Sequence, residues 1–117
     1  MNLRIPGPVP LPNAILKLVG SQMINHRGPL YAEMLERITR NLGIALATDS
    51  DICLMTSSGT GVMEAAVVNT LSPGDRVLAV SIGTFGDRFG EIAAAYGADV
   101  DFLRFPLGQA ADPVVIR

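Results

Sequence analysis

The stretch TSSGTGVMEAAVVN, residues 56–69, decides the fold, because two glycines stand where a strand changes to a helix. Just before it, residues 52–56 (ICLMT) form a short continuous apolar run, which is typical of a strand covered on both faces. After the turn, the sequence predicts a helix over residues 61–71. The stretch therefore predicts a strand–turn–helix unit with a glycine-rich turn at its centre.

The chain after this unit continues the alternation of strands and helices. It predicts a strand at residues 76–81, a helix at 85–96 that ends at Gly97, and a third strand at 98–105. Strands that alternate with helices through short connections lie parallel, and their crossovers are right-handed. The pattern therefore predicts an α/β fold with a parallel sheet.

The N-terminal part of the chain differs in composition from the rest. Four prolines and a glycine in residues 1–12 predict an extended arm, and residues 12–20 predict a short helix. From Pro29 onward a long helix is predicted, because apolar residues recur at helical spacing, at Leu30, Met34, Ile38 and Leu42. We therefore divide the chain into an arm with a short helix, residues 1–28, and an incomplete large domain, residues 29–117.

The last residues indicate that this domain is cut short. Asp112 and Pro113 are a typical cap and first residue of a helix, and only four residues follow them. A domain whose sequence stops one turn into a helix is expected to be a fragment of a larger one.

Charge and composition exclude several classes of partner. Nine basic and 11 acidic residues give a formal charge of −2, so the chain has no basic stripe for a nucleic acid or an acidic membrane. Cys53 is the only cysteine, which rules out an internal disulfide and favours a reducing, cytoplasmic setting. No apolar run is long enough to span a bilayer, and prolines interrupt any N-terminal signal helix.

The glycine-rich turn has the composition of an anion site. Helix N-termini present unpaired N–H groups and a partial positive charge, so they attract phosphate. Gly59 and Gly61 would let the backbone approach an anion, and Ser57, Ser58 and Thr60 would add hydroxyl donors. On the residues alone, a phosphate-bearing ligand and a turn that merely caps a helix are equally open.

Two common phosphate-binding motifs are absent from this turn. A P-loop requires a lysine, and the only lysine, Lys17, lies far away in the sequence. The dinucleotide fingerprint requires a third glycine where Glu64 stands, and an acidic residue at the end of the second strand, which reads AVSIG over residues 79–83. A small NAD-binding domain is therefore disfavoured.

A second glycine-bracketed turn, GTFGDR at residues 83–88, follows the second strand at the same edge of the predicted sheet. Phe85 stands between its glycines. An aromatic side chain beside a phosphate site would stack on a flat ring of the ligand. Packing of Phe85 down onto the sheet at the start of the helix is the equally open alternative.

Five segments taken together resemble the opening portion of class V aminotransferases: PGPVPLP, MINHRGPLY, TSSGTGVMEAAVVN, PGDRVLAVSIGTFGDRF and YGADV. These enzymes use pyridoxal 5′-phosphate, have fold type I, and include the alanine–glyoxylate and serine–glyoxylate aminotransferases. A cyanobacterial relative labelled a soluble hydrogenase subunit is similar too. The resemblance implies part of a three-layer αβα large domain with a mostly parallel sheet.

The resemblance also assigns site residues. It implies that Ser58, Gly59 and Thr60 form the cup that binds the cofactor phosphate. Phe85 matches the position whose aromatic ring stacks on the cofactor pyridine, which is tryptophan in several relatives. Gly7 and Pro8 match an N-terminal arm that helps shape the substrate pocket.

A further segment, Asn25, His26 and Arg27, matches a part of the family near the dimer interface and the active-site entrance. On the residues alone, His26 is a surface or interface histidine rather than a proton shuttle. Family members are homodimers, so the resemblance implies a homodimer, or association with a chain that supplies the rest of the fold. An exposed apolar sheet edge would promote such association.

The catalytic groups of the family are expected outside this chain. Transamination requires a Schiff-base lysine, an acid at the pyridine nitrogen and usually an arginine for the substrate carboxylate. In the family all three come from regions beyond the equivalent of residue 117, and nothing argues for Lys17 as a replacement. The complete enzyme is expected to move an amino group from alanine or serine to a 2-oxo acid such as glyoxylate, whereas this chain alone is expected to be inactive. A non-catalytic phosphate-binding or assembly subunit is the alternative.

Overall fold

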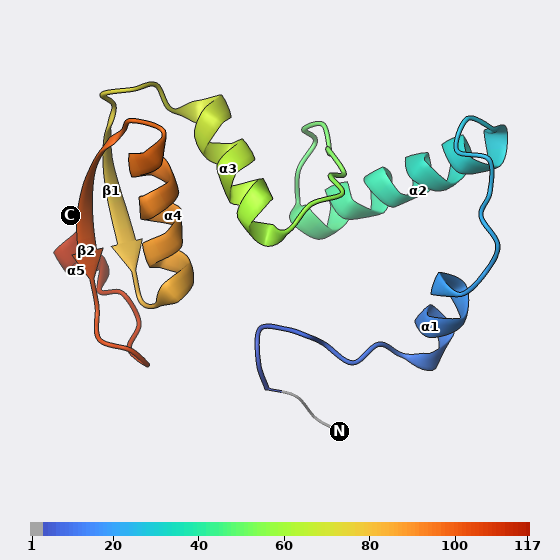
Figure 1. Cartoon of the computed structure of the whole chain (residues 1–117), viewed down its shortest axis with the longest axis horizontal. Helices are drawn as coiled ribbons and strands as arrows, with labels where there is room; N and C mark the ends of the chain where they lie inside the picture. The colour runs from blue at the N-terminus through green and yellow to red at the C-terminus, as the bar shows by residue number, and fades with distance from the viewer. Residues whose placement is uncertain (1–3) are drawn as a thin grey trace. The chain divides into compact units, whose positions relative to one another are not determined.

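The computed structural model describes residues 4–117, so the first three residues of the predicted arm lie outside the described part. The chain divides into two compact units, Met1–Cys53 and Leu54–Arg117. The division falls inside the predicted large domain rather than at its predicted start, residue 29. Each unit has its own elements, which are labelled along the chain in Figure 1.

The first unit contains two helices, α1 (Asn13–Val19) and α2 (Pro29–Leu46). Helix α1 begins after Pro12 and ends at Gly20, as predicted. Helix α2 has proline at its first position and ends at Ala47, whose φ of 50° is left-handed. The backbone N–H of Thr48 then donates to the carbonyl oxygen of Gly43, which closes the helix end.

The predicted apolar stripe of α2 is present, yet it is not covered. No residue of α2 is buried, and the side chains of Leu30 and Leu46 are 69% and 64% exposed. A helix with an apolar face gains most of its stability from burying that face. Within the first unit, the described residues provide no surface that buries the stripe.

The second unit is an α/β arrangement. It contains helices and strands in the order α3 (Gly59–Thr70), β1 (Arg76–Ser81), α4 (Thr84–Ala95), β2 (Asp99–Arg104) and α5 (Pro113–Ile116). The two strands pair in parallel, with Arg76 opposite Asp99 and Ser81 opposite Arg104. Helix α4 connects them and lies beside both strands (Figure 1). The predicted parallel β–α–β unit is therefore confirmed.

The predicted strand at residues 52–56 is wrong. These residues form neither strand nor helix, and Leu54 and Met55 are 51% and 53% exposed. A strand is stable only when a neighbour satisfies its backbone N–H and carbonyl groups. Within the described residues β1 and β2 pair only with each other, so this apolar run has no strand beside it.

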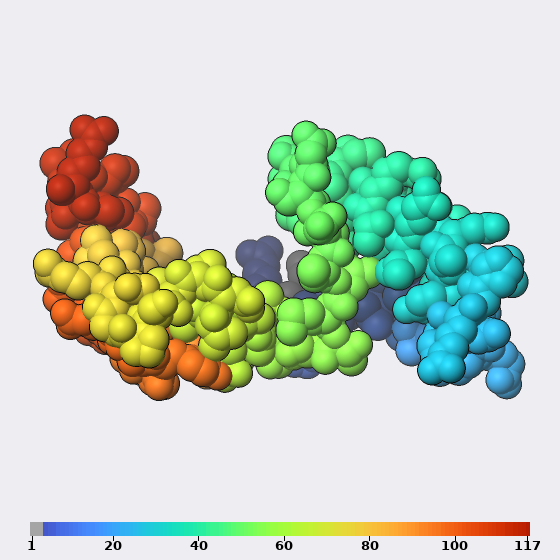
Figure 2. Space-filling view, turned by 90° about the horizontal axis from the view of Figure 1, so that it is seen from above, coloured from blue at the N-terminus to red at the C-terminus, as the bar shows by residue number. Residues whose placement is uncertain are grey.

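The core of the second unit lies where α3 and α4 meet the strands. Val67, Ile92 and Ala93 are buried, and the partly buried Met63, Leu71, Ala98 and Val100 pack against them. In the space-filling view the yellow and orange segments, which run from the end of α3 to β2, form one continuous body (Figure 2).

Two glycines let α4 approach the strands closely. A Cβ atom at Gly90 would lie 2.8 Å from the Cβ of Ala79 and would meet the ring of Phe102, while one at Gly86 would lie 2.8 Å from the Cα of Ser81. Positions four residues apart share one face of a helix. The face of α4 that carries Gly86 and Gly90 therefore packs directly against β1 and β2.

The ends of the elements follow the predicted local signals. Gly97 has a φ of +90° just after α4, the conformation that favours glycine at this position. Asp112 caps α5, its Oδ1 accepting from the N–H of Val114 at 2.8 Å. None of the helices described is both long and apolar enough to cross a membrane.

Candidate functional site

The N-terminus of α3 contains the predicted phosphate-binding turn. Ser58 is extended (φ −77°, ψ 164°) and its Oγ accepts a hydrogen bond from the N–H of Gly61 at 3.2 Å. Among residues 4–117, the backbone N–H groups of Gly59 and Thr60 have no protein acceptor. The turn therefore presents two free backbone donors at the positive end of a helix of 12 residues.

The two glycines of this turn have different roles. A Cβ atom at Gly59 would meet nothing within 4 Å, and Gly59 is exposed, so the space beside it is open. A Cβ atom at Gly61 would collide with the hydroxyl of Ser57. Gly59 is thus the glycine that leaves room for a ligand, whereas Gly61 makes room for a side chain of the protein.

An arginine from α4 reaches this turn. The Nη1 of Arg88 donates to the Oγ1 of Thr60 at 3.3 Å, which joins the start of α3 to the first turns of α4. Sequence reasoning did not identify Arg88, although it belongs to the GTFGDR segment that drew attention to Phe85. The available signal was a basic residue in a glycine-bracketed turn at the predicted ligand edge of the sheet.

Phe85 lies in the first turn of α4 and its side chain is 59% exposed. A ring that packed down on the sheet would be largely buried, so the exposure argues against that alternative. More than half of the side chain is available to a ligand or to another part of a protein.

Ser81 supports the turn that carries Phe85. It ends β1, is 2% exposed, and is the one polar residue buried among those that the structure describes. Its Oγ donates to the carbonyl oxygen of Gly83 at 2.9 Å and accepts from the N–H of Gly83 at 3.2 Å. The side chain thus stabilises the tight passage from β1 to α4, a role that no sequence pattern indicated.

The other predicted site residues belong to the first unit. Gly7 and Pro8 lie in an exposed bend joined by a cis peptide bond. Asn25, His26 and Arg27 lie in an exposed turn, where the Oδ1 of Asn25 accepts from the N–H of Arg27 at 3.0 Å. Their assignment to the substrate pocket and the subunit boundary stays a prediction.

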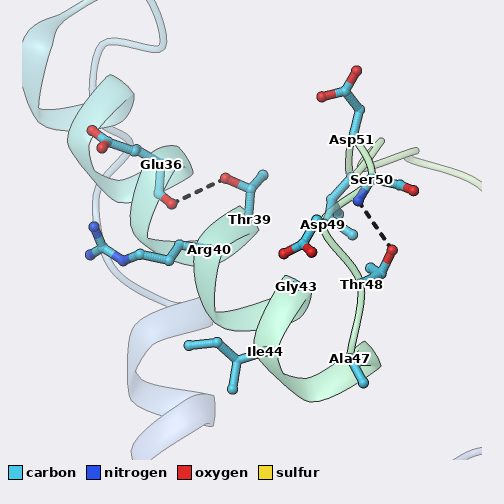
Figure 3. A pocket seen from close by; sticks show the side chains of 11 residues that line it. Glu36, Thr39, Arg40, Gly43, Ile44, Ala47, Thr48, Asp49, Ser50 and Asp51 are labelled. Atoms are coloured by element: carbon cyan, nitrogen blue, oxygen red, sulfur yellow. Dashed lines mark hydrogen bonds between the residues drawn. The ribbon is translucent and has the colours of Figure 1, made fainter.

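The first unit has a large hollow of its own. It measures about 560 Å³ and lies between the C-terminal half of α2 and residues 47–52 (Figure 3). Glu36, Asp49 and Asp51 bring carboxylates to it, and Arg40 brings a guanidinium. In residues 4–117 no three His, Cys, Asp or Glu side chains gather closely enough to hold a metal ion. Nothing in this hollow selects a ligand.

Comparison with known proteins places the chain. No protein-family profile matches it. It is 41% identical over 111 residues to a soluble hydrogenase 42 kDa subunit of Anabaena cylindrica, covering 95% of this chain and 29% of that protein. It is 39% identical over 106 residues to the L-aspartate–glyoxylate aminotransferase of Paracoccus denitrificans. This match covers 90% of this chain and 27% of that protein.

A solved structure agrees with these sequence relatives. The alanine–glyoxylate aminotransferase of Nostoc sp. superposes with a TM-score of 0.86 at 28% identity, covering 95% of this chain and 30% of that one. The chain is a relative of the class V aminotransferases. The predicted family, its α/β fold and the similarity to a hydrogenase-labelled protein are confirmed. The chain spans less than one third of the length of these class V relatives.

Proposed function

We propose that the chain is the phosphate-binding part of a pyridoxal-phosphate-dependent aminotransferase. The observation that supports the proposal is the start of α3, where free N–H groups of Gly59 and Thr60 stand beside the hydroxyl of Ser58. The names of two related proteins share glyoxylate and differ in the amino donor, aspartate in one and alanine in the other. We therefore propose glyoxylate as the 2-oxo acid, and we keep alanine or serine, the donors that the family resemblance implies, as the amino donor.

The residues present fit the phosphate end of the cofactor. The two free backbone donors can bind a doubly charged oxyanion, the open space beside Gly59 leaves room for it, and Phe85 offers an exposed ring to the pyridine. When bound, the cofactor supplies the ring that stabilises negative charge on the substrate carbon. The start of α3 holds and orients this group.

The remaining site residues carry over from the resemblance as part of the proposal. Gly7 and Pro8 would shape the substrate pocket of the complete protein, and Asn25, His26 and Arg27 would lie near its subunit boundary. The assignment of Gly7 and Pro8 to the substrate pocket is tested with a Pro8→Ala variant of the complete protein. It should alter the KM for the amino acid, and an unchanged KM would argue against that assignment.

The cup is tested by replacing its two hydroxyl side chains. In calorimetric titrations of the full chain, pyridoxine 5′-phosphate replaces the natural cofactor because it has no aldehyde and cannot react with lysine. The double variant Ser58→Ala, Thr60→Ala should bind this probe at least about tenfold more weakly, since hydrogen bonds to a charged group contribute roughly 1.5–3 kcal/mol each. Circular dichroism at the same temperature checks that α3 is retained after the loss of its cap.

The matched control is the double variant Thr70→Ala, Ser72→Ala at the other end of α3, which should bind like the wild type. In the same titrations Phe85→Ala should weaken the probe about three- to tenfold, because a stacked aromatic pair contributes about 0.5–1.5 kcal/mol. Equal affinities of the wild type and the Ser58→Ala, Thr60→Ala variant would refute the cup. Equal affinities for pyridoxine phosphate and phosphate-free pyridoxine would do the same.

The hydrogenase-labelled relative favours a second candidate, a non-catalytic assembly subunit. Both candidates predict that the isolated chain has no aminotransferase activity. As part of an aminotransferase, the chain should produce no pyruvate from alanine and glyoxylate above the rate with free pyridoxal phosphate, because Lys17, in α1, is its only lysine. Turnover that is lost in a Lys17→Ala variant would contradict this expectation.

The state of association separates the two candidates. The proposed enzyme forms a homodimer or joins a chain that supplies the rest of its fold, so light scattering should give a mass well above 12.4 kDa. A stable monomer that binds the probe would instead favour the non-catalytic subunit.

We also place the protein in the cytoplasm, since its single cysteine, Cys53, is free and exposed. Cell fractionation tests that placement.

A further inference from the structure

Arg88 is left without a carboxylate partner at a place where a positive charge is unfavourable. The adjacent carboxylate, Asp87, is engaged by Arg104 through an ion pair of 2.9 Å. Within the described residues the only other ion pair joins Arg76 and Asp101. Arg88 instead points its Nη1 at Thr60 Oγ1, beside the positive end of α3.

This arrangement is electrostatically unbalanced. The free N–H groups at the start of α3 carry a partial positive charge, and the guanidinium of Arg88 brings a full positive charge beside it. The carboxylate of α3, Glu64, lies in its second turn and forms no ion pair with Arg88. An anion bound between these groups would remove the imbalance, and a neutral ligand would not.

In the hydrogen bonds at this turn, both hydroxyl groups act as acceptors. The Oγ of Ser58 accepts from the N–H of Gly61, and the Oγ1 of Thr60 accepts from Arg88. A hydroxyl group has a single proton, and in both residues it remains free to donate elsewhere. The start of α3 therefore presents two backbone donors and two hydroxyl donors, which suits a ligand that only accepts.

From these observations we infer that Arg88 is a specificity-determining residue, which selects a doubly charged phosphate group by adding positive charge and by orienting the hydroxyl of Thr60. This inference rests on the proposed function, because it concerns the same phosphate site. It differs from a merely structural link between α3 and α4, which would affect charged and neutral ligands alike.

The test compares charge and hydrogen bonding at position 88 in the full chain. Arg88→Gln removes the charge but keeps a donor group, and Arg88→Lys keeps the charge. Affinity for pyridoxine 5′-phosphate should fall about tenfold in Arg88→Gln and at most about threefold in Arg88→Lys, while affinity for phosphate-free pyridoxine should be unchanged in both. Arg76→Gln, which removes an arginine from the far end of β1, is the matched control and should bind like the wild type.

A pH profile gives a readout that a structural role would not move. The second pKa of a phosphate monoester is about 6. Affinity of the wild type should therefore rise between pH 5 and pH 7.5 as the dianion forms, and this rise should be at least halved in Arg88→Gln. If a variant fails to fold, the dependence of wild-type affinity on ionic strength replaces the comparison of variants. An affinity for pyridoxine phosphate that ionic strength does not change would overturn the inference.

Each outcome has a separate meaning. A wild-type chain that does not bind pyridoxine phosphate overturns the proposed function and this inference with it. Binding by the wild type that Arg88→Gln leaves unchanged overturns the role of Arg88 alone. An equal loss of affinity for pyridoxine and its phosphate in Arg88→Gln also overturns it, because Arg88 then acts only through the fold.

Discussion

Replacement of Gly90 by leucine is expected to destabilise the second unit by about 3 kcal/mol or more. Gly90 is buried, and even one added carbon would lie 2.8 Å from the Cβ of Ala79 and would overlap the ring of Phe102. Leucine adds three more. Helix propensity favours leucine over glycine by less than about 1 kcal/mol, which is too little to offset the displacement of α4 from both strands.

Thermal unfolding followed by circular dichroism measures this effect in the full chain. About 1 kcal/mol shifts the Tm of a unit of this size by roughly 4–8 °C, so a loss of at least about 12 °C is expected. Ala94→Leu is the matched control, because Ala94 lies in the last turn of α4, where the helix is exposed. A Tm in Gly90→Leu equal to that of Ala94→Leu would show that α4 does not pack on the strands through Gly90.

The parts of the fold that sequence predicts well are those whose causes are local. Pro29 starts a helix because proline tolerates a first helical position, and Asp112 caps one because its carboxylate reaches the N–H two residues on. Gly97 ends α4 because only glycine adopts a φ of +90° without strain. In each case the signal and its structural partner lie within a few residues of each other.

The strand predicted at residues 52–56 fails for the opposite reason. An apolar run indicates that a segment will be buried, whereas forming a strand also requires a partner strand elsewhere in the chain. The stripe of α2 shows the same limit, because its spacing predicts the helix but does not identify what covers it. The relatives are more than three times as long as this chain, which leaves ample sequence in them to supply such partners.

The sequence predicted the position of the candidate site, but the prediction lacked two of the residues that the structure places near it. Glycines and hydroxyl residues at the predicted strand-to-helix junction pointed to the start of α3, and the resemblance to a known family implies a phosphate ligand there. Arg88 was missed because its contact with Thr60 spans 28 residues and depends on how α4 lies against α3. Ser81 was missed because a serine at the end of a strand has no distinctive pattern.

Ser81 is therefore the position where fold and site are expected to fail together. The Ser81→Val variant loses both hydrogen bonds to Gly83 and adds a methyl group where a Cβ at Gly86 would already lie 2.9 Å from the serine Oγ. The carbonyl of Gly83 still accepts from the N–H of Asp87, so the unsatisfied, partly buried N–H of Gly83 and the overpacking together should lower the stability of the unit by about 3 kcal/mol. The Ser81→Ala variant loses the hydrogen bonds without the added bulk and should cost about 1–2 kcal/mol.

The effect on binding should exceed what the loss of stability explains. The turn at Gly83 positions the start of α4, which carries both Phe85 and Arg88, so any shift there moves the ring and the charge relative to α3. At a temperature where Ser81→Ala remains folded, its affinity for pyridoxine phosphate should fall several-fold. Ser72→Val, at an exposed serine of the same unit, should change neither Tm nor affinity. If Ser81→Ala keeps wild-type affinity, the turn after β1 does not position the phosphate site, and α3 alone determines binding.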